Sequence, residues 1–196
     1  EAGIKAETAD RSFGVDVAGY YIDWSNIQVA FNNNGFSSIH NAPGGATIRG
    51  AELSVTLRPV RPLLFSGAFA YQDAELDEAD VDLNAAKGER LPNVPRFTGT
   101  VSADYELPLD QWHPSIGATI RHVGERASGF GSAYRLPEYT TVDLRTSLEL
   151  GPVDAQLYVR NLFDRLGELS IAYPQFGGRE AIVQPRTIGI TLTTRF

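Results

Sequence analysis

The side chains best suited to chemistry are few and scattered along this chain. Its three histidines, His40, His113 and His122, lie far apart in the sequence and lack the paired spacing of a zinc site. No nucleophile elbow, phosphate-binding loop or metalloprotease signature occurs, and no Ser–His–acid set can be assembled. We therefore expect no catalytic residue, no metal site, no cofactor and no enzymatic activity.

A run of carboxylates between Asp73 and Asp82 is the other feature that could attract a ligand. The run lacks the ligand spacing and the turn glycine of an EF-hand calcium loop, so we interpret it as a solvated loop. The whole chain has 24 acidic and 17 basic residues, which give a formal net charge of -7. Nucleic-acid binding requires clustered Lys and Arg against the phosphates, so this balance argues against a nucleic-acid partner.

The elements that carry these residues alternate apolar and polar side chains with a period of two, which is typical of β-strands. In residues 187–196, one face carries Ile188, Ile190, Leu192, Thr194 and Phe196, and the opposite face is polar or small. The same alternation runs through residues 51–58, 97–107 and 141–150. We expect a nearly all-β fold whose strands each have one apolar and one polar face.

Short and long connections alternate along the chain. The short turns, built from Pro, Gly or Asp, fall near residues 8–10, 59–62, 108–114 and 151–152. The long loops between them are residues 32–45, 76–94, 124–138 and 165–184. Tight turns on one rim and extended loops on the other are typical of an outer-membrane β-barrel.

A soluble β-sandwich would show the same period, so alternation alone leaves both folds open. Strand length favours the membrane, because several strands reach about ten residues against the usual five or six of globular proteins. Aromatic residues also gather near strand ends, where interfacial girdles would place them, namely Tyr20, Tyr21, Trp24, Tyr71, Tyr105, Trp112, Tyr139 and Phe196.

Two stretches near the carboxy terminus carry a family resemblance. Residues 159–164 read VRNLFD, and residues 185–196 read PRTIGITLTTRF. With the earlier stretches EAGIKAE, GYYIDWSNIQV, ATIRGAELSVTLRP, GERLPNVPRF and LPEYTTVDLR, in this order, they resemble the carboxy-terminal region of TonB-dependent outer-membrane receptors. The resemblance covers essentially the whole chain. The alternating Ile190, Leu192 and terminal Phe196 are similar to the barrel-assembly signal of that family, although Thr194 is less apolar than usual there.

The resemblance implies a barrel of 22 strands around a plug, of which we count about nine antiparallel strands here. Residues 1–196 are therefore expected to be the carboxy-terminal portion of the barrel, with the plug domain and the amino-terminal strands absent. The chain lacks methionine, so it does not begin at a start codon and is expected to be a mature product or a fragment. The implied location is the Gram-negative outer membrane. The implied partners are outer-membrane lipid and lipopolysaccharide (LPS), TonB–ExbB–ExbD through the missing amino-terminal region, and the barrel-assembly machinery through Phe196.

Within such a barrel, alternation predicts a lumen-facing wall that contains Glu52, Arg58, Asp143, Arg145 and Arg160. Any barrel lumen is polar, which is sufficient to explain Glu52 and Arg58. For Asp143, Arg145 and Arg160, cross-strand charge pairing is the simplest role. In the last long loop, the aromatic and basic side chains are predicted to contact an external ligand, because recognition concentrates in loops on a rigid scaffold; they are Tyr173, Phe176 and Arg179.

Two functions remain open on these grounds. The resemblance implies TonB-dependent active transport of a scarce, bulky nutrient, most often a ferric siderophore or similar iron complex. The alternative is a small complete outer-membrane barrel that binds a partner or has a structural role without energised uptake. The sequence upstream of Glu1 discriminates between them, because a plug and a TonB-engaging segment would support transport, whereas a signal peptide there would support the small barrel.

Overall fold

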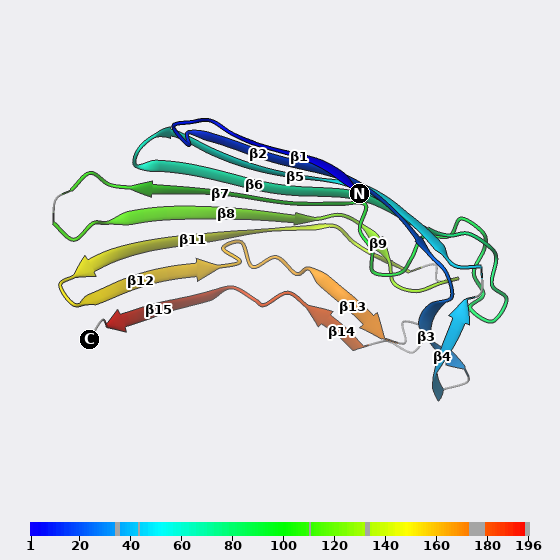
Figure 1. Ribbon diagram of the computed structural model, residues 1–196. Coiled ribbons are helices and arrows are strands. Elements are labelled where there is room, and N and C mark those ends of the chain that lie inside the picture. The colour runs from blue at the N-terminus through cyan, green and yellow to red at the C-terminus, as the bar shows by residue number, and fades with distance from the viewer. Residues whose placement is uncertain (34–35, 43, 110, 132–133, 173–178, 195–196) are drawn as a thin grey trace.

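In the part of the chain that the structure describes, nine strands form one antiparallel sheet in the order β1-β2-β5-β6-β7-β8-β11-β12-β15. The computed structural model describes residues 1–33, 36–42, 44–109, 111–131, 134–172 and 179–194. The strands are β1 Ala2–Glu7, β2 Phe13–Trp24, β5 Ala46–Val60, β6 Leu63–Leu76, β7 Phe97–Glu106, β8 Ser115–Val123, β11 Tyr139–Leu150, β12 Val153–Arg160 and β15 Thr187–Thr194. The sheet is curved, with β1 at one edge and β15 at the other (Figure 1). The predicted all-β fold with about nine strands is confirmed.

Short turns join the strands at one rim of the sheet, and long connections join them at the other (Figure 1). Two of the turns span two residues, because Val60 pairs with Leu63 and Leu150 pairs with Val153. Gly151 in the second turn has a φ of 66°, a left-handed conformation that favours glycine. Within the described ranges, no helix is both long enough and apolar enough to cross a membrane.

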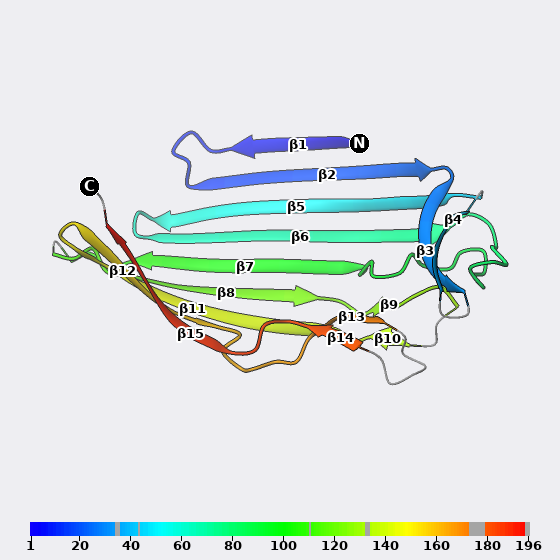
Figure 2. The ribbon, with the colours of Figure 1, turned by 90° about the horizontal axis from the view of Figure 1, so that it is seen from below.

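The strand register separates apolar from polar side chains. One row across the sheet consists of Ala6, Val15, Val55, Gly67, Val101, Ile120 and Val142. On β11, Leu144 and Leu148 share the face of this row and are exposed, whereas Asp143 and Arg145 on the opposite face are half-buried. Side chains crowd together on the inner side of a curved sheet, so we assign the polar face as concave and the apolar face as convex. The curvature can be followed in Figure 2.

The long connections contain small hairpins of their own. These pair β3 Ile27–Asn33 with β4 Phe36–Ala42, β9 Arg126–Ala127 with β10 Arg135–Leu136, and β13 Glu168–Ala172 with β14 Arg179–Ile182. The loop predicted at residues 32–45 therefore begins too late, because Ile27 already pairs with Ala42 outside the main sheet. The period of two is the same in a wall strand and in a loop hairpin, so the sequence could not separate them.

A small hydrophobic core lies beneath these connections. Its buried members are Ile27, Ala42, Ala46, Ala74, Leu76, Leu83, Ala85 and Leu91. The loop of residues 76–94 is thus folded against apolar side chains rather than fully solvated, which corrects the interpretation of the acidic run. Asp73 and Glu75 belong to β6, and Asp80 is only 9% exposed, with a carboxylate oxygen that accepts the Leu83 N–H at 3.1 Å.

The predicted aromatic girdle is correct only in part. Tyr21, Tyr71 and Tyr105 lie on the convex face and are exposed. Tyr20 and Tyr139 occupy concave-face positions, and Tyr139 is 8% exposed. Neighbouring residues of a strand point to opposite faces, so Tyr20 and Tyr21 cannot both face lipid.

Candidate functional site

An ion pair crosses the concave face of the sheet near the end that carries the short turns. Arg145 on β11 binds the Asp104 carboxylate on β7, passing over Gly117 on the intervening strand β8. The Arg145 Nη1 also donates to Thr119 Oγ1 at 2.9 Å. A Cβ at position 117 would lie 2.7 Å from Arg145 Nε, so glycine gives this pair the space it occupies. Arg145 was predicted as a wall residue, but its pairing with Asp104 was not, because sequence alone does not give strand register.

Aromatic side chains also lie flat against the concave face. The Tyr20 hydroxyl reaches across Gly50 to donate to Gln72 Oε1 at 3.3 Å. On the same face, near the β15 edge of the sheet, the ring of Tyr158 lies over Gly189. Glycine on the neighbouring strand thus lets each large polar ring fold down on the wall instead of projecting from it.

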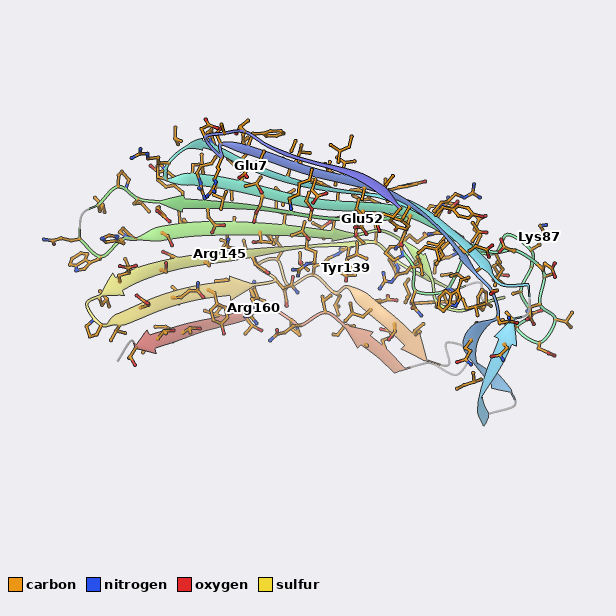
Figure 3. The ribbon with its side chains drawn as sticks, in the orientation of Figure 1. Glu7, Glu52, Lys87, Tyr139, Arg145 and Arg160 are labelled. Carbon is orange, nitrogen blue, oxygen red and sulfur yellow. The ribbon has the colours of Figure 1, made fainter. Side chains whose placement is uncertain are left out.

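The predicted wall residues can be followed in Figure 3, which labels Glu52, Arg145 and Arg160. These three and Asp143 occupy concave-face positions. The Arg160 guanidinium lies 4.8 Å from the Tyr158 ring centroid. Asp143 does not pair with Arg145; its carboxylate accepts the Asn161 N–H at 2.8 Å.

Arg58 differs from the other four, because it lies at the rim where the β5–β6 ladder is irregular. Its backbone N–H donates to the Ser12 carbonyl at 2.6 Å. For all five residues, contact with a barrel lumen stays a prediction.

A pocket of about 440 Å³ lies at the end of the sheet that carries the short turns. Its lining includes the carboxylates of Glu106, Glu149 and Asp154 and the imidazole of His113. Among the described residues, no group of three or more His, Cys, Asp or Glu side chains is placed to hold a metal ion. The pocket is therefore an acidic, open recess on the wall.

The VRNLFD stretch forms a tight junction where β12 ends. Asn161 is 4% exposed, and its Nδ2 donates to the carbonyls of Arg165 and Gln184, both at 3.0 Å. Its Oδ1 accepts the Arg165 N–H at 2.9 Å. Asp164 Oδ1 accepts the Arg186 N–H at 2.8 Å, which ties the junction to the segment before β15. One asparagine thus fixes both ends of the long connection at residues 165–184.

The predicted ligand-contacting residues belong to this same connection. Tyr173 and Phe176 lie outside the described residues. Arg179 begins β14, where it pairs with Ala172 of β13. The base of this hairpin contacts Arg126 and Tyr134 of the connection at residues 124–138 and Tyr139 at the start of β11. None of the three was singled out for this role from the sequence. No sequence signal identifies Arg126, since one arginine in a loop is unremarkable.

The order of the strands, the two unlike faces and the asymmetric rims agree with the comparison to known proteins. A family model described as the TonB dependent receptor-like β-barrel matches residues 1–162. This chain belongs to the TonB-dependent receptor-like β-barrel family. As a member of it, the chain is part of a Gram-negative outer-membrane β-barrel, with the convex apolar face suited to lipid.

Curated relatives of this receptor chain are much longer than the chain itself. It is 34% identical over 168 residues to the metal-pseudopaline receptor CntO of Pseudomonas aeruginosa, a match that covers 84% of the chain and 23% of the relative. It is 26% identical over 192 residues to the ferrioxamine B receptor of Salmonella typhimurium, covering 93% of the chain and 26% of that protein. The receptor chain therefore spans about a quarter of the length of the curated relatives it matches.

Solved structures agree with the fold of the receptor chain. The closed form of the ferric-catecholate import receptor Fiu from Escherichia coli K12 has a TM-score of 0.76 at 26% identity, covering 99% of this chain and 27% of that one. The ferric yersiniabactin uptake receptor FyuA from Yersinia pestis has a TM-score of 0.79 at 22% identity, covering 96% and 28%. At 22% identity, the similarity to FyuA supports the fold alone.

The residues predicted as a barrel-assembly signal lie at the β15 edge of the receptor chain. Ile190 and Leu192 are on the convex face, 65% and 63% exposed. Phe196 lies outside the described residues. Their role in assembly stays a prediction.

Proposed function

We propose that this chain is the carboxy-terminal part of the barrel wall of a receptor that imports a metal chelate through the outer membrane by TonB-dependent active transport. The supporting observation is the combination of family membership with a wall of nine strands, whose apolar convex face suits lipid and whose polar concave face suits an aqueous lumen. Elaborate hairpins on one rim provide the surface on which recognition concentrates.

The substrate class follows from what the relatives are named for. CntO is a metal-pseudopaline receptor and the Salmonella protein is a ferrioxamine B receptor. A chelated metal is common to both names, so a metal–organic complex, such as a ferric siderophore, is the substrate class we propose. We propose transport rather than catalysis as the activity.

The open edges of the sheet favour a larger barrel over a small complete one. β1 and β15 stand at opposite ends of the strand order and do not pair with each other in the part of the chain that the structure describes. Unpaired backbone groups are not tolerated in lipid, so further strands must cover these edges. The chain spans about a quarter of its curated relatives, and proteins of that length can contain these further strands.

The remaining partners belong to the whole receptor. Energy would come from TonB–ExbB–ExbD, engaged by a part of the protein outside these 196 residues. The convex face would contact phospholipid and LPS, and the β15 end with Phe196 would be the segment that the barrel-assembly machinery engages.

Uptake by the intact receptor tests this function. A strain that lacks the full gene should lose energy-dependent uptake of at least one radiolabelled metal chelate from a panel of iron, nickel, cobalt and zinc complexes. Uptake should return on complementation and stop when the cytoplasmic membrane is de-energised. Unchanged uptake of every chelate in the panel, or uptake that continues without energy, would contradict the proposal.

A further inference from the structure

The hairpin β13–β14 at the extracellular rim is held by side chains of the connection that precedes it. Arg126, at the start of β9, is 4% exposed, and its Nη2 donates to the carbonyls of Glu168 at 2.5 Å and Leu169 at 3.0 Å. These carbonyls are consecutive, so a single guanidinium nitrogen holds the first two residues of β13. A buried guanidinium that binds main-chain oxygens fixes the position of that backbone strongly.

Two tyrosines add contacts at the start of the hairpin, to Gly167 and Glu168. The Tyr134 hydroxyl donates to Glu168 Oε2 at 2.6 Å. The Tyr139 ring lies against Gly167, where a Cβ would approach ring carbon Cδ1 to 2.9 Å. The Arg126 guanidinium lies over that ring, 5.8 Å from its centroid. Arg126 thus contacts the hairpin directly and also packs on the tyrosine that contacts it.

The contacts of Arg126, Tyr134 and Tyr139 with residues 167–169, which we call the clamp, lie close to the base of the hairpin. Asn161 fixes the two ends of the connection at Arg165 and Gln184, and the Val183 N–H donates to the Gly167 carbonyl at 2.8 Å. The clamp at residues 167–169 lies next along the hairpin from this junction. Farther along the hairpin, Ala172 of β13 pairs with Arg179 of β14.

We propose that Arg126 is a positioning residue that couples two extracellular connections, residues 124–138 and 165–184, so that they present the ligand-contacting hairpin as one rigid unit. The coupling of the two connections does not depend on the proposed transport function; only its consequence for ligand recognition rests on that function. The buried Nη1 of Arg126 has no hydrogen-bond partner among the described residues.

The test measures amide hydrogen exchange in the ligand-free, full-length receptor, so it is independent of whether any chelate is transported. Arg126→Ala removes the hydrogen bonds to the Glu168 and Leu169 carbonyls. Gly167→Ala displaces the Tyr139 ring, on which the Arg126 guanidinium packs. Each variant should exchange at least tenfold faster at residues 167–172 and 179–183, and exchange in β11 and β12 should not change.

Because both substitutions break the same clamp, the double variant should exchange no faster than the faster single variant. Arg135→Ala is the matched control, because Arg135 lies in the same connection and is exposed. It should behave as the wild type. If Arg126→Ala does not fold, Gly167→Ala and Tyr134→Phe carry the test.

Unchanged exchange in the hairpin would overturn the proposal. Faster exchange that spreads to β3–β4 and to residues 76–94 would also overturn it, since that result would show general loosening of the rim. Additive effects of the two substitutions would show two independent contacts in place of one clamp.

Discussion

At the scale of single residues, glycine decides where large polar side chains lie on the concave face. Gly117 lies beneath the Arg145–Asp104 pair, and Gly50 and Gly189 lie beneath tyrosine rings. A methyl group at any of these positions would occupy space that the side chain now fills. At these three positions, a glycine on one strand makes room for a large side chain from its neighbour.

Gly117→Ala should destabilise the wall by about 1–3 kcal/mol, because the added Cβ displaces a side chain that is already packed. The measurement is the free energy of unfolding of the receptor in lipid vesicles, by denaturant titration. Gly14→Ala is the control, since a Cβ there would meet only Thr56 Cβ, at an ordinary 3.9 Å. Equal stability of the two variants would show that Arg145 moves away without cost.

Tyr134 provides a prediction on pH. Its hydrogen bond to Glu168 raises its pKa from 10.0 to about 12, because that bond requires the protonated phenol and the nearby carboxylate opposes a phenolate. The folded pKa is raised, so the stabilisation is complete below pH 10 and is lost as the pH rises through about 12. Spectrophotometric titration should show a phenol that ionises near pH 12 and disappears in Tyr134→Phe. Identical titration curves for the two proteins would refute the assigned hydrogen bond.

At the scale of elements, alternation predicted the wall well, because an apolar and a polar face are each imposed on every strand. The short turns at residues 59–62 and 151–152 were predicted because Pro and Gly mark them. The hairpins inside the long connections were not predicted, since wall strands and loop hairpins have the same period of two. Cross-sheet partners, such as Asp104 for Arg145, depend on register, which a single sequence does not reveal.

The Asn161 junction is the element whose loss should affect the rim most. Asn161→Ala removes the amide that binds the Arg165 and Gln184 carbonyls and leaves these groups without their partner. The expected cost is about 1–3 kcal/mol of unfolding free energy. Thermal or denaturant unfolding of the purified receptor measures it. Gln184→Ala keeps the accepting carbonyl and should be neutral; if both variants lose the same stability, the amide is not the cause.

At the scale of the whole molecule, a membrane barrel wall requires one face of the sheet to meet lipid and the other to meet a polar interior. Val55 and Thr56 are adjacent on β5, so their side chains point to opposite faces. Val55 lies in the apolar row that crosses the sheet, and Thr56 lies on the polar face.

The most direct test is the folding of Val55→Arg and Thr56→Arg in the full-length receptor, measured as the free energy of folding into lipid vesicles. A charged side chain on the lipid face near the middle of the bilayer costs about 2–4 kcal/mol, so Val55→Arg should lose about that amount. Thr56→Arg should fold with nearly wild-type stability, because its guanidinium enters a polar lumen. The reverse order, or equal losses for the two variants, would contradict the assignment of this chain as a membrane barrel wall with a polar interior.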